Sequence, residues 1–528
     1  MIRDILKQAI RKTLEQEVDF SVEIPVNSEH GDYSSNVAMI LAGILKDKPL
    51  EVAEKIKKEL ERSEEIKKYI SKIEIVGPGF LNFWISEDAL IEELKKLDLK
   101  ITFGKKQKIQ VEFISANPTG ALHIGHLRSA FYGQALGNIL ELAGYKIERE
   151  YFINDSKEST QIKELGKTAL SKGESYLTDN LKSKVKSQKS KIQIKIQKFR
   201  EPEKLAGEVG YLVAGEIQKD NQKFIEKELG IKFDKWFSEE KELRQKKEFA
   251  KTIKTLEKKN LTYQKDGAWW LKTSEFGDDE DRVLLRSDGA TSYFLSDIAY
   301  HSHKFKREFK KIINIWGADH QGHVKRMQAV KKIFNWPGDL VILISQLVTI
   351  KEAGQTKKLS KRKGNVILAE DLLKEVGSDA MRWFFLEKSL SSHMDFDLIL
   401  AKEQSEKNPV FYAQYAGARM SSILKKAKEK KRKIDFSSLG LAEKSTLFLV
   451  KKLIQFPEVI EDIAEDYQIH RLTTYVYQLA TIFNIFYRDV KVLGSGENEP
   501  SRLVLVAQSR QILSKCLSLL GLSAPEKM

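Results

Sequence analysis

The chain has 528 residues, 41% of them hydrophobic, and is long enough for about three to four folding units, each with a buried core. Lys and Arg outnumber Asp and Glu by 90 to 75, and the formal charge of +15 favours a polyanion such as nucleic acid as a partner, although a soluble enzyme can also carry a basic surface. The single cysteine, Cys516, excludes an internal disulfide and a zinc site built from several cysteines, so a reducing cytoplasm is expected.

The first 90 residues predict a small α/β domain. The opening segment MIRDILKQAIRKTLEQEV has helical apolar spacing, but it lacks the continuous apolar core of a secretion signal. VAMILAGIL (37–45) and LEVAEKIKKEL (50–60) predict helices, and KIEIVGPGFLNFWIS (72–86) predicts strand interrupted by a turn at Gly77. The chain contains no run of about 18 apolar residues, so no membrane span is expected.

The middle of the chain predicts a doubly wound, Rossmann-like domain with a mostly parallel sheet. KIQVEFI (108–114) is typical of a short buried strand, and SAFYGQALGNILELAGY (129–145) predicts a helix closed by Gly144. Strand candidates then alternate with helical stretches, as in a doubly wound fold. These candidates are KIEREYFIND (146–155), TSYFLSDIAYH (291–301), KIINIWGADHQGH (311–323) and LVILISQLVTI (340–350).

A lysine-rich segment, LKSKVKSQKSKIQIKIQKFREPEK (181–204), predicts an insertion over about 176–245. Charge runs usually keep a surface hydrated, so a solvated helical face is favoured over direct contact with nucleic acid. The expected domains are therefore 1–90, 91–400 with this insertion, and 401–528.

The last domain is expected to be an all-α helical bundle, because the pattern from about residue 408 onward is helical almost throughout. One apolar stripe steps by four and three residues, as the buried face of a bundle helix does. Its members are Leu472, Val476, Leu479, Phe483 and Phe486.

Two histidines in SANPTGALHIGHLRSA (115–130) stand between the strand and the helix. If the helix begins near His123, its first backbone amides face the carboxyl edge of the sheet, where anions bind. Gly125 leaves room for a flat base, and His123 and His126 can donate hydrogen bonds to phosphate oxygens. By itself the H-x-G-H pattern is weak and fits structural or chance histidines equally well.

A second stretch, TKKLSKRKGN (356–365), brings Lys358, Ser360 and Lys361 together in a cationic loop. Such a loop could clamp a triphosphate and stabilise the charge on a departing pyrophosphate. Alone it fits a solvated turn or a basic localisation patch better. The two loops together predict a site for a nucleoside triphosphate.

These motifs carry a resemblance to a known family. HIGH (123–126) is identical to the first signature of class I aminoacyl-tRNA synthetases, and KLSKR (358–362) resembles the second, K-M-S-K-S, with Leu for Met and Arg for Ser. Within that class the chain resembles arginyl-tRNA synthetase over nearly its whole length. The segments that carry this likeness are FISANPTGALHIGHLRSA, YFINDSKESTQI, SDGATSYFLSDIAYH, GADHQGHVKRM, KLSKRKGNVILAEDLLKEVGSDAMRWFFL and NPVFYAQYAGAR.

The resemblance implies an arginine–tRNA ligase of protein synthesis. Such an enzyme converts arginine and ATP to arginyl-adenylate and pyrophosphate, then transfers arginine to the terminal adenosine of tRNA(Arg) and releases AMP. The residues implied in catalysis are His123, His126, Lys358 and Lys361, and those implied in ATP binding are Gly125, His323 and Ser360. Mg²⁺ would accompany the ATP, and no protein-bound metal is expected. Many family members lack a lysine at the position of Lys361, so how strictly activation requires bound tRNA stays open.

A pocket for arginine needs carboxylates that form a fork around the planar guanidinium. The resemblance implies Asp297 for this role, with Tyr293 beside it and Glu239 as a second acid, although adjacent Glu240 leaves the register open. Without the resemblance Asp297 would be interpreted as a helix cap.

The rest of the substrate is assigned to uncharged side chains. Gln321 matches the family residue that orients arginine, and Ser115 and Asn117 match those near its amino and carboxylate groups. The i, i+3 spacing of His320 and His323 also fits a metal site, but no third ligand is evident.

Contacts with tRNA are implied at both ends of the chain. Phe80 and Asn82 match residues that touch the D-loop, although Phe80 and Phe83 fit the core of a strand equally well. The carboxyl-terminal region resembles an anticodon-binding domain, where unstacked bases rest on aromatic side chains. The candidates there are Tyr412, Gln414, Tyr415, Tyr487 and Arg488, and Gly417 replaces a histidine common in the family motif.

Two other functions remain open from the sequence. A nucleotidyltransferase of the same H-x-G-H superfamily would use ATP without tRNA, but such enzymes are shorter and lack a large helical tail. A catalytically silent RNA-binding paralogue would have no physical reason to keep both histidines and both lysines. We expect a monomeric, cytoplasmic enzyme with tRNA(Arg), L-arginine and ATP as partners and no membrane association.

Overall fold

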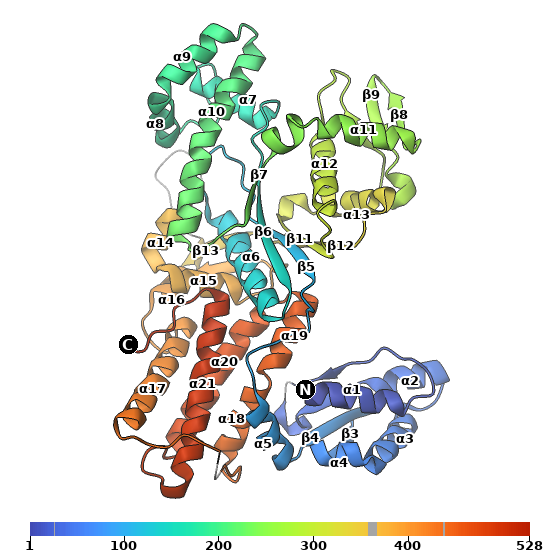
Figure 1. Cartoon of the computed structure of the whole chain (residues 1–528), viewed down its shortest axis with the longest axis vertical. Coiled ribbons are helices and arrows are strands. Elements are labelled where there is room, and N and C mark those ends of the chain that lie inside the picture. Colours follow the sequence, from blue (N-terminus) through green and yellow to red (C-terminus); the bar gives the residue numbers. More distant parts are fainter. Residues whose placement is uncertain (26, 357–366, 437–438) are drawn as a thin grey trace.

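The computed structural model describes residues 1–25, 27–356, 367–436 and 439–528. Its first part is a four-stranded antiparallel sheet in the order β1-β2-β4-β3, accompanied by five helices (Figure 1). The strands β3 and β4 form a hairpin around Gly77, as the sequence predicts. The elements are α1 (Ile2–Lys12), β1 (Val22–Glu23), β2 (Tyr33–Ser35), α2 (Val37–Leu45), α3 (Pro49–Arg62), α4 (Glu64–Tyr69), β3 (Ile70–Val76), β4 (Phe80–Ile85) and α5 (Glu87–Lys96).

A five-stranded parallel sheet in the order β12-β11-β5-β6-β7 forms the centre of the molecule. It confirms the predicted doubly wound fold. The chain adds β6 and β7 on one side of β5 and then crosses to the other side for β11 and β12, so the order reverses between β5 and β11. Ligands bind at such a reversal, beyond the carboxyl ends of the strands. The elements are β5 (Lys108–Glu112), α6 (Ile124–Leu142), β6 (Lys146–Ile153), β7 (Lys235–Ser238), β11 (Lys311–Gly317), α13 (His323–Phe334) and β12 (Asp339–Ser345).

The prediction of a strand at TSYFLSDIAYH is wrong. Most of this segment forms the start of α12 (Tyr293–Phe305). The hydroxyl of Ser292 caps this helix by accepting a hydrogen bond from the N–H of Leu295, at 3.2 Å. Phe294, Leu295, Ile298 and Ala299 are all buried, and their spacing gives one face of a helix. The cap is Ser292 and not Asp297, which lies in the second turn.

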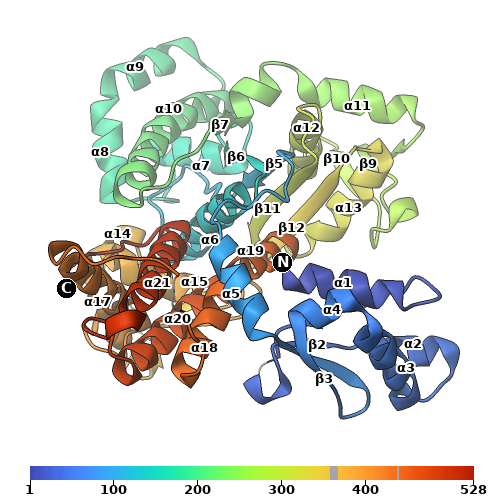
Figure 2. The ribbon, with the colours of Figure 1, turned by 60° about the horizontal axis from the view of Figure 1, so that its bottom comes forward.

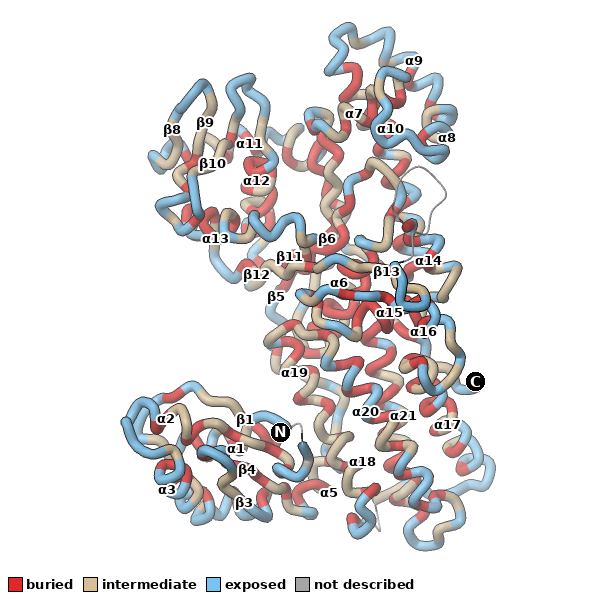
Figure 3. Tube along the Cα trace, turned by 180° about the vertical axis from the view of Figure 1, so that it is seen from behind, coloured by how far each residue is buried: buried red, intermediate tan, exposed pale blue. Residues whose placement is uncertain are grey.

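Two lobes extend from the central sheet (Figure 1). The first contains α7 (Thr160–Ala169), α8 (Asp179–Ser187), α9 (Lys189–Lys198) and α10 (Pro202–Lys223). A Cβ on Gly166 would lie 1.8 Å from the carbonyl oxygen of Ala206, so glycine is required where α7 and α10 touch. Exposed residues dominate α8 and α9 (Figure 3).

The second lobe follows β7 in the chain. It contains a turn of π-helix at Glu240–Arg244, then α11 (Glu248–Lys258) and an antiparallel sheet in the order β10-β9-β8. Its strands are β8 (Thr262–Lys265), β9 (Ala268–Leu271) and β10 (Arg282–Leu285).

The predicted strand LVILISQLVTI is split between two sheets. Its first half is β12, and its second half begins β13 of a small sheet in the order β14-β13-β15. This small sheet and three short helices connect the central sheet to the carboxyl-terminal bundle. They are β13 (Val348–Glu352), β14 (Gln355–Thr356), α14 (Ala369–Val376), α15 (Ser378–Leu386), β15 (Met394–Asp397) and α16 (Leu398–Lys402).

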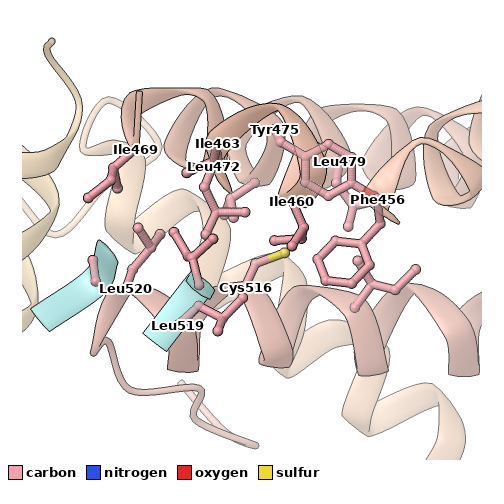
Figure 4. Packing of buried hydrophobic residues seen from close by; sticks show 14 of the residues in the cluster. Phe456, Ile460, Ile463, Ile469, Leu472, Tyr475, Leu479, Cys516, Leu519 and Leu520 are labelled. Atoms are coloured by element: carbon pink, nitrogen blue, oxygen red, sulfur yellow. The ribbon is translucent and has the colours of Figure 1, made fainter. Parts of the chain in front are cut away.

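The described residues from 409 onward form a helical bundle. The predicted stripe from Leu472 to Phe486 is buried in its core, where Cys516 packs among Phe456, Ile460 and Tyr475 (Figure 4). A lysine-rich run, LKKAKEKKRKI (424–434), lies partly inside α17, which continues to Glu429. The helices are α17 (Pro409–Glu429), α18 (Lys444–Ile454), α19 (Phe456–Asp466), α20 (His470–Asp489) and α21 (Glu499–Leu520).

One described segment, Gly496–Leu520, is long and apolar enough to cross a membrane. However, 61% of its most apolar window is buried within the protein. This is the burial expected of a bundle's central helix.

The amino-terminal part docks on the bundle, with α5 between them (Figure 2). Buried Arg3 on α1 donates to Glu461 and Asp462 of α19, each at 2.6 Å. The hydroxyl of Tyr33 donates to Glu458 at 2.7 Å, and burial raises the pKa of Glu458 to about 7. These charged contacts position the amino-terminal part relative to the bundle.

Candidate active site

The chain turns sharply where β5 ends. Ile114 and Ser115 have φ angles of 67° and 41°, a region that residues with side chains rarely adopt. Ser115 Oγ donates to Glu112 Oε1 at 2.9 Å and accepts from the N–H of Phe152 at 3.1 Å. The hydroxyl of Ser115 therefore ties the strained turn to β5 on one side and β6 on the other.

The helix α6 begins with His123 as its cap. The Nδ1 atom of His123 accepts from the N–H of Gly125 at 3.1 Å, and the Nδ1 atom of His126 accepts from the N–H of His123 at 3.2 Å. A neutral imidazole whose Nδ1 accepts must carry its proton on Nε2. Both histidines are thus left with Nε2–H as their donor toward a ligand.

Both imidazoles are neutral near pH 7. Burial lowers the pKa of His123, and burial together with the neighbouring His123 lowers the pKa of His126 to about 3. The two rings lie close together, with centroids 3.7 Å apart and planes tilted by 33°. A Cβ on Gly125 would lie 3.0 Å from the ring of His123, so glycine lets this ring fold back over the helix start. An anion here would meet hydrogen-bond donors rather than imidazolium charge.

The predicted residues Lys358, Ser360 and Lys361 lie outside the described residues. The first described residues after them contact the histidine motif directly. The N–H of Ile124 donates to the carbonyl of Ile367 at 3.0 Å, and the N–H of Ala369 donates to Leu122 at 2.9 Å. The structure therefore places residues 367–369 against the start of α6.

Three carboxylates, those of Asp297, Glu112 and Glu239, lie near one another. Burial raises the pKa of Asp297 to about 7, and the negative charges of Glu112 and Glu239 add to this effect while Lys304 opposes it. Burial also raises the pKa of Glu239 to about 7, opposed by Arg244, whose Nε lies 3.7 Å from Glu239 Oε1. A cation entering this place would stabilise the ionised carboxylates, so the site favours a positively charged ligand.

The structure distinguishes Glu239 from Glu240. Glu239 is the electrostatic neighbour of Asp297, whereas Glu240 Oε2 accepts from the N–H of Lys157 at 3.3 Å. The N–H of Glu240 donates to Asp155 at 2.9 Å. Glu239 therefore lies near Asp297, while Glu240 holds the backbone of Lys157, and the assignment of Glu239 to the arginine pocket stays a prediction.

The sequence reasoning missed Glu112 and Asn154. Glu112 is 5% exposed at the end of β5 and holds Ser115. Asn154 Nδ2 donates to Asn117 Oδ1 at 3.1 Å, while its own buried Oδ1 has no partner among the described residues. Glu112 could have been found from the sequence, because it stands inside the apolar strand KIQVEFI. A carboxylate buried there needs a partner that compensates for its lost hydration.

Three of the other predicted substrate contacts are exposed to solvent. They are Asn117, Tyr293 and Gln321, and Gln321 follows β11 at the carboxyl edge of the sheet. His320 and His323 have ring centroids 5.5 Å apart, and burial lowers the pKa of His323. Within the described ranges, no group of three or more His, Cys, Asp or Glu side chains could hold a metal ion.

At the amino-terminal part, Phe80 and Asn82 differ in exposure. Phe80 is 37% exposed, whereas Phe83 is fully buried, so only Phe83 is a core residue. Asn82 is buried and accepts from Ser34 Oγ at 2.7 Å. Of the predicted pair, Phe80 alone offers its side chain to a partner, and the contact itself stays a prediction.

On the bundle, Tyr415 and Tyr487 are exposed on α17 and α20, with Arg419 over both rings at 4.9 and 5.3 Å from their centroids. Arg488 is also exposed, and Tyr412 is partly so. Gln414 is not on this face: it is buried and donates to Asp379 at 2.7 Å and to Ser523 at 2.9 Å. Its amide supports the junction between α15 and the end of the chain, so this arrangement does not favour base contact by Gln414.

Comparisons with known proteins cover the whole chain. Residues 1–85 match the family described as arginyl tRNA synthetase N terminal domain, residues 87–397 match tRNA synthetases class I (R), catalytic domain, and residues 413–528 match the DALR anticodon binding domain. The arginine–tRNA ligase of Oceanobacillus iheyensis is 38% identical over 98% of this chain and 96% of its own length. That of Syntrophotalea carbinolica is 39% identical over 97% of this chain and 95% of its own.

Solved structures agree on the fold. Arginyl-tRNA synthetase from Thermus thermophilus superposes with a TM-score of 0.81 at 22% identity, covering 100% of both chains. The arginyl-tRNA synthetase of Plasmodium falciparum gives a TM-score of 0.79 at 21% identity, covering 100% of this chain and 98% of its own.

Proposed function

The chain belongs to the arginyl-tRNA synthetase family and is an arginine–tRNA ligase, and we propose that it activates arginine at the carboxyl edge of β5 and β11. The family implies ATP, arginine and tRNA as its partners. The observation that carries this location is the proximity of Asp297 and Glu239 to Glu112, which ends β5, the strand that leads into the helix beginning at His123. We propose that the cation pocket and the anion-binding helix start lie at this same edge of the sheet.

In the proposed first step, a carboxylate oxygen of arginine attacks the α-phosphorus of ATP and the bond to pyrophosphate breaks. His123 and His126 donate Nε2–H to phosphate oxygens, and the backbone at Gly125 allows the base to approach closely. Lys358, Ser360 and Lys361 are proposed to hold the leaving pyrophosphate, with His323 beside the nucleotide. Mg²⁺ is proposed to arrive with ATP as part of the substrate.

The arginine itself is proposed to lie between the helix α12 and the end of β5. Asp297 and Glu239 pair with the guanidinium, with Tyr293 against it, because only paired carboxylates offset the desolvation of that group. Ser115, Asn117 and Gln321 are proposed to bind the amino and carboxylate groups. This places the nucleophilic carboxylate of arginine toward His123 and the phosphates.

In the second step, a hydroxyl of the terminal ribose of tRNA attacks the carbonyl of the mixed anhydride, and AMP leaves. We propose that Phe80 contacts the tRNA elbow and that Tyr412, Tyr487 and Arg488 contact anticodon bases. The exposed rings on α17 and α20 support the second assignment, because unstacked bases rest on aromatic faces. We further propose a monomer that works in the cytoplasm.

Purified protein incubated with ATP, labelled arginine and total tRNA tests this function. We expect labelled tRNA only when all three components are present, and no charging when lysine or citrulline replaces arginine. Charging with either analogue would contradict the carboxylate pocket, because neither side chain presents a guanidinium. Adenylation of another acceptor without tRNA would favour a nucleotidyltransferase instead.

A further inference from the structure

Lys304 is a cation buried without solvent contact beneath the proposed arginine pocket. Its side chain is 0% exposed at the end of α12, and Nζ donates to Glu112 Oε2 on β5 and to Asn314 Oδ1 on β11, the latter at 2.9 Å. A buried ammonium requires such partners because it has lost its water. Lys304 therefore bridges the two strands between which the sheet order reverses.

The first arm of this bridge reaches Ser115. One carboxylate oxygen of Glu112 is held by Lys304, and the other accepts from Ser115 Oγ at 2.9 Å. Ser115 in turn stands in the strained turn after β5. With one oxygen fixed by the ammonium, the carboxylate keeps a single orientation, and Ser115 keeps the rotamer that faces the proposed amino group of arginine.

The second arm reaches Asp297. Asn314 Nδ2 lies 2.7 Å from His301 Nε2, and His301 Nδ1 lies 2.8 Å from the carbonyl oxygen of Asp297. A carbonyl only accepts, so Nδ1 carries the proton, Nε2 accepts from Asn314, and Asn314 must turn its oxygen to Lys304. Burial and the charge of Lys304 lower the pKa of His301 to about 3, which keeps this ring neutral.

We propose that Lys304 is a positioning residue that orders the arginine pocket, acting through Glu112 on Ser115 and through Asn314 and His301 on the backbone of α12 at Asp297. Its ammonium also places a positive charge against Glu112, which lies beside the acids Asp297 and Glu239. The inference rests on the proposed arginine pocket. The ionisable groups around Lys304 and Glu112 on the neighbouring elements are Glu150, Glu239, Asp297, Tyr300, His301 and Arg307.

The test is the pH dependence of the KM for arginine in Lys304→Met, a variant of similar shape without charge. In this variant the buried carboxylate of Glu112 has lost the ammonium of Lys304. A buried carboxylate without a cation is expected to take up a proton at neutral pH and to lose it only at higher pH. We expect the KM for arginine to rise about 10- to 100-fold at pH 7 and to fall back toward the wild-type value by pH 9. The KM for ATP should stay within about twofold of wild type.

The matched control is Lys306→Met, which removes the same charge two residues on, where the side chain is 65% exposed. It should leave both KM values unchanged. The double variant Glu112→Gln with Lys304→Met removes both charges of this ion pair and leaves neither partner buried alone, so it should fold even if the single variant does not. Its KM for arginine should be raised and should keep only the wild-type pH dependence, which comes from Asp297 and Glu239.

Two results would overturn the proposal. One is a wild-type KM for arginine in the single or the double variant. The other is a loss of arginine and ATP binding together at every pH, which indicates a purely structural role. Asp297→Asn, measured in parallel, separates a failure of the role given to Lys304 from a failure of the proposed arginine pocket. If Asp297→Asn also leaves arginine use intact, the pocket itself is misplaced.

Discussion

His123 and Leu368 form an antiparallel β-bridge, although they lie far apart in the sequence. The bridge joins the cap of α6 to the residue that precedes α14. The hydrogen bond from Ile124 to Ile367 reinforces it at 3.0 Å. The histidine motif is therefore held by the backbone of a distant segment as well as by its own helix.

The hydrogen bonds of the two histidines predict which substitutions are tolerated. Because Nε2–H is the free donor in both rings, glutamine can place an N–H near that position, whereas asparagine reaches only the position of Nδ1. We expect His123→Gln and His126→Gln to keep about tenfold more activity in ATP–pyrophosphate exchange than the corresponding asparagine variants. The opposite order would show that Nδ1 is the group used in the reaction.

The raised pKa values of Asp297 and Glu239, both about 7, predict that arginine binds with release of protons. Below pH 7 these carboxyls are protonated and pair poorly with a guanidinium. The KM for arginine should therefore rise as pH falls from 8 to 6, by up to about tenfold per pH unit for each proton released. Calorimetry of arginine binding at pH 7 in two buffers of different ionisation enthalpy measures this release. Equal heats in the two buffers would contradict it.

Asp297→Asn is predicted to stabilise the protein at alkaline pH. Folded Asp297 keeps its proton up to about pH 7, whereas the unfolded chain loses it near 3.8, so this group makes folding less favourable as pH rises between those values. A shift of about three pKa units corresponds to roughly 4 kcal/mol, and the asparagine amide must still be accommodated. We expect a gain of about 1–2 kcal/mol in the free energy of unfolding at pH 8 and almost none at pH 4. Urea unfolding at both pH values tests the sign.

The exposed face of Tyr415, Arg419 and Tyr487 predicts a contribution to tRNA binding. A base that stacks on such a face contributes about 1–3 kcal/mol. Tyr415→Ala should raise the KM for tRNA about 5- to 100-fold and leave the KM for arginine unchanged. Tyr176→Ala, which removes an exposed tyrosine from the lobe of α7 to α10, is the matched control. Equal effects of the two variants would mean that the bundle face is not the contact.

The sequence predicted the parallel sheet and the helical bundle because their apolar patterns are long and regular. It did not predict that TSYFLSDIAYH is helical, since an apolar run beginning Tyr-Phe-Leu fits a strand equally well. The helix is fixed by the cap at Ser292, a local hydrogen bond that the apolar pattern does not show. The motif at His123 was recognisable from the sequence once it was combined with the cationic loop that follows later in the chain. The tautomers of its rings were not, because they depend on which backbone N–H each ring meets.

Burial explains the other differences. Glu112 and Lys304 lie far apart in the sequence, and only the folded sheet shows that each is the partner of the other. Gln414 looked available beside Tyr412, but a helix turns successive side chains to different faces, and this one turns inward to Asp379. Long-range pairing of polar residues is the part of the site that spacing alone does not determine.

The measurement that tests the proposed pocket most directly compares arginine use by Asp297→Asn, Glu239→Gln and Glu240→Gln. Removing one partner of a buried charge pair costs about 2–5 kcal/mol, so kcat/KM for arginine should fall roughly 30- to 5,000-fold in the first two variants. Glu240→Gln is the matched control, because its side chain faces the backbone of Lys157 and not the pocket. The account predicts normal tRNA affinity in all three and wild-type kcat/KM for arginine in the control. Equal losses in the three variants, or parallel losses of arginine use and tRNA affinity, would contradict it.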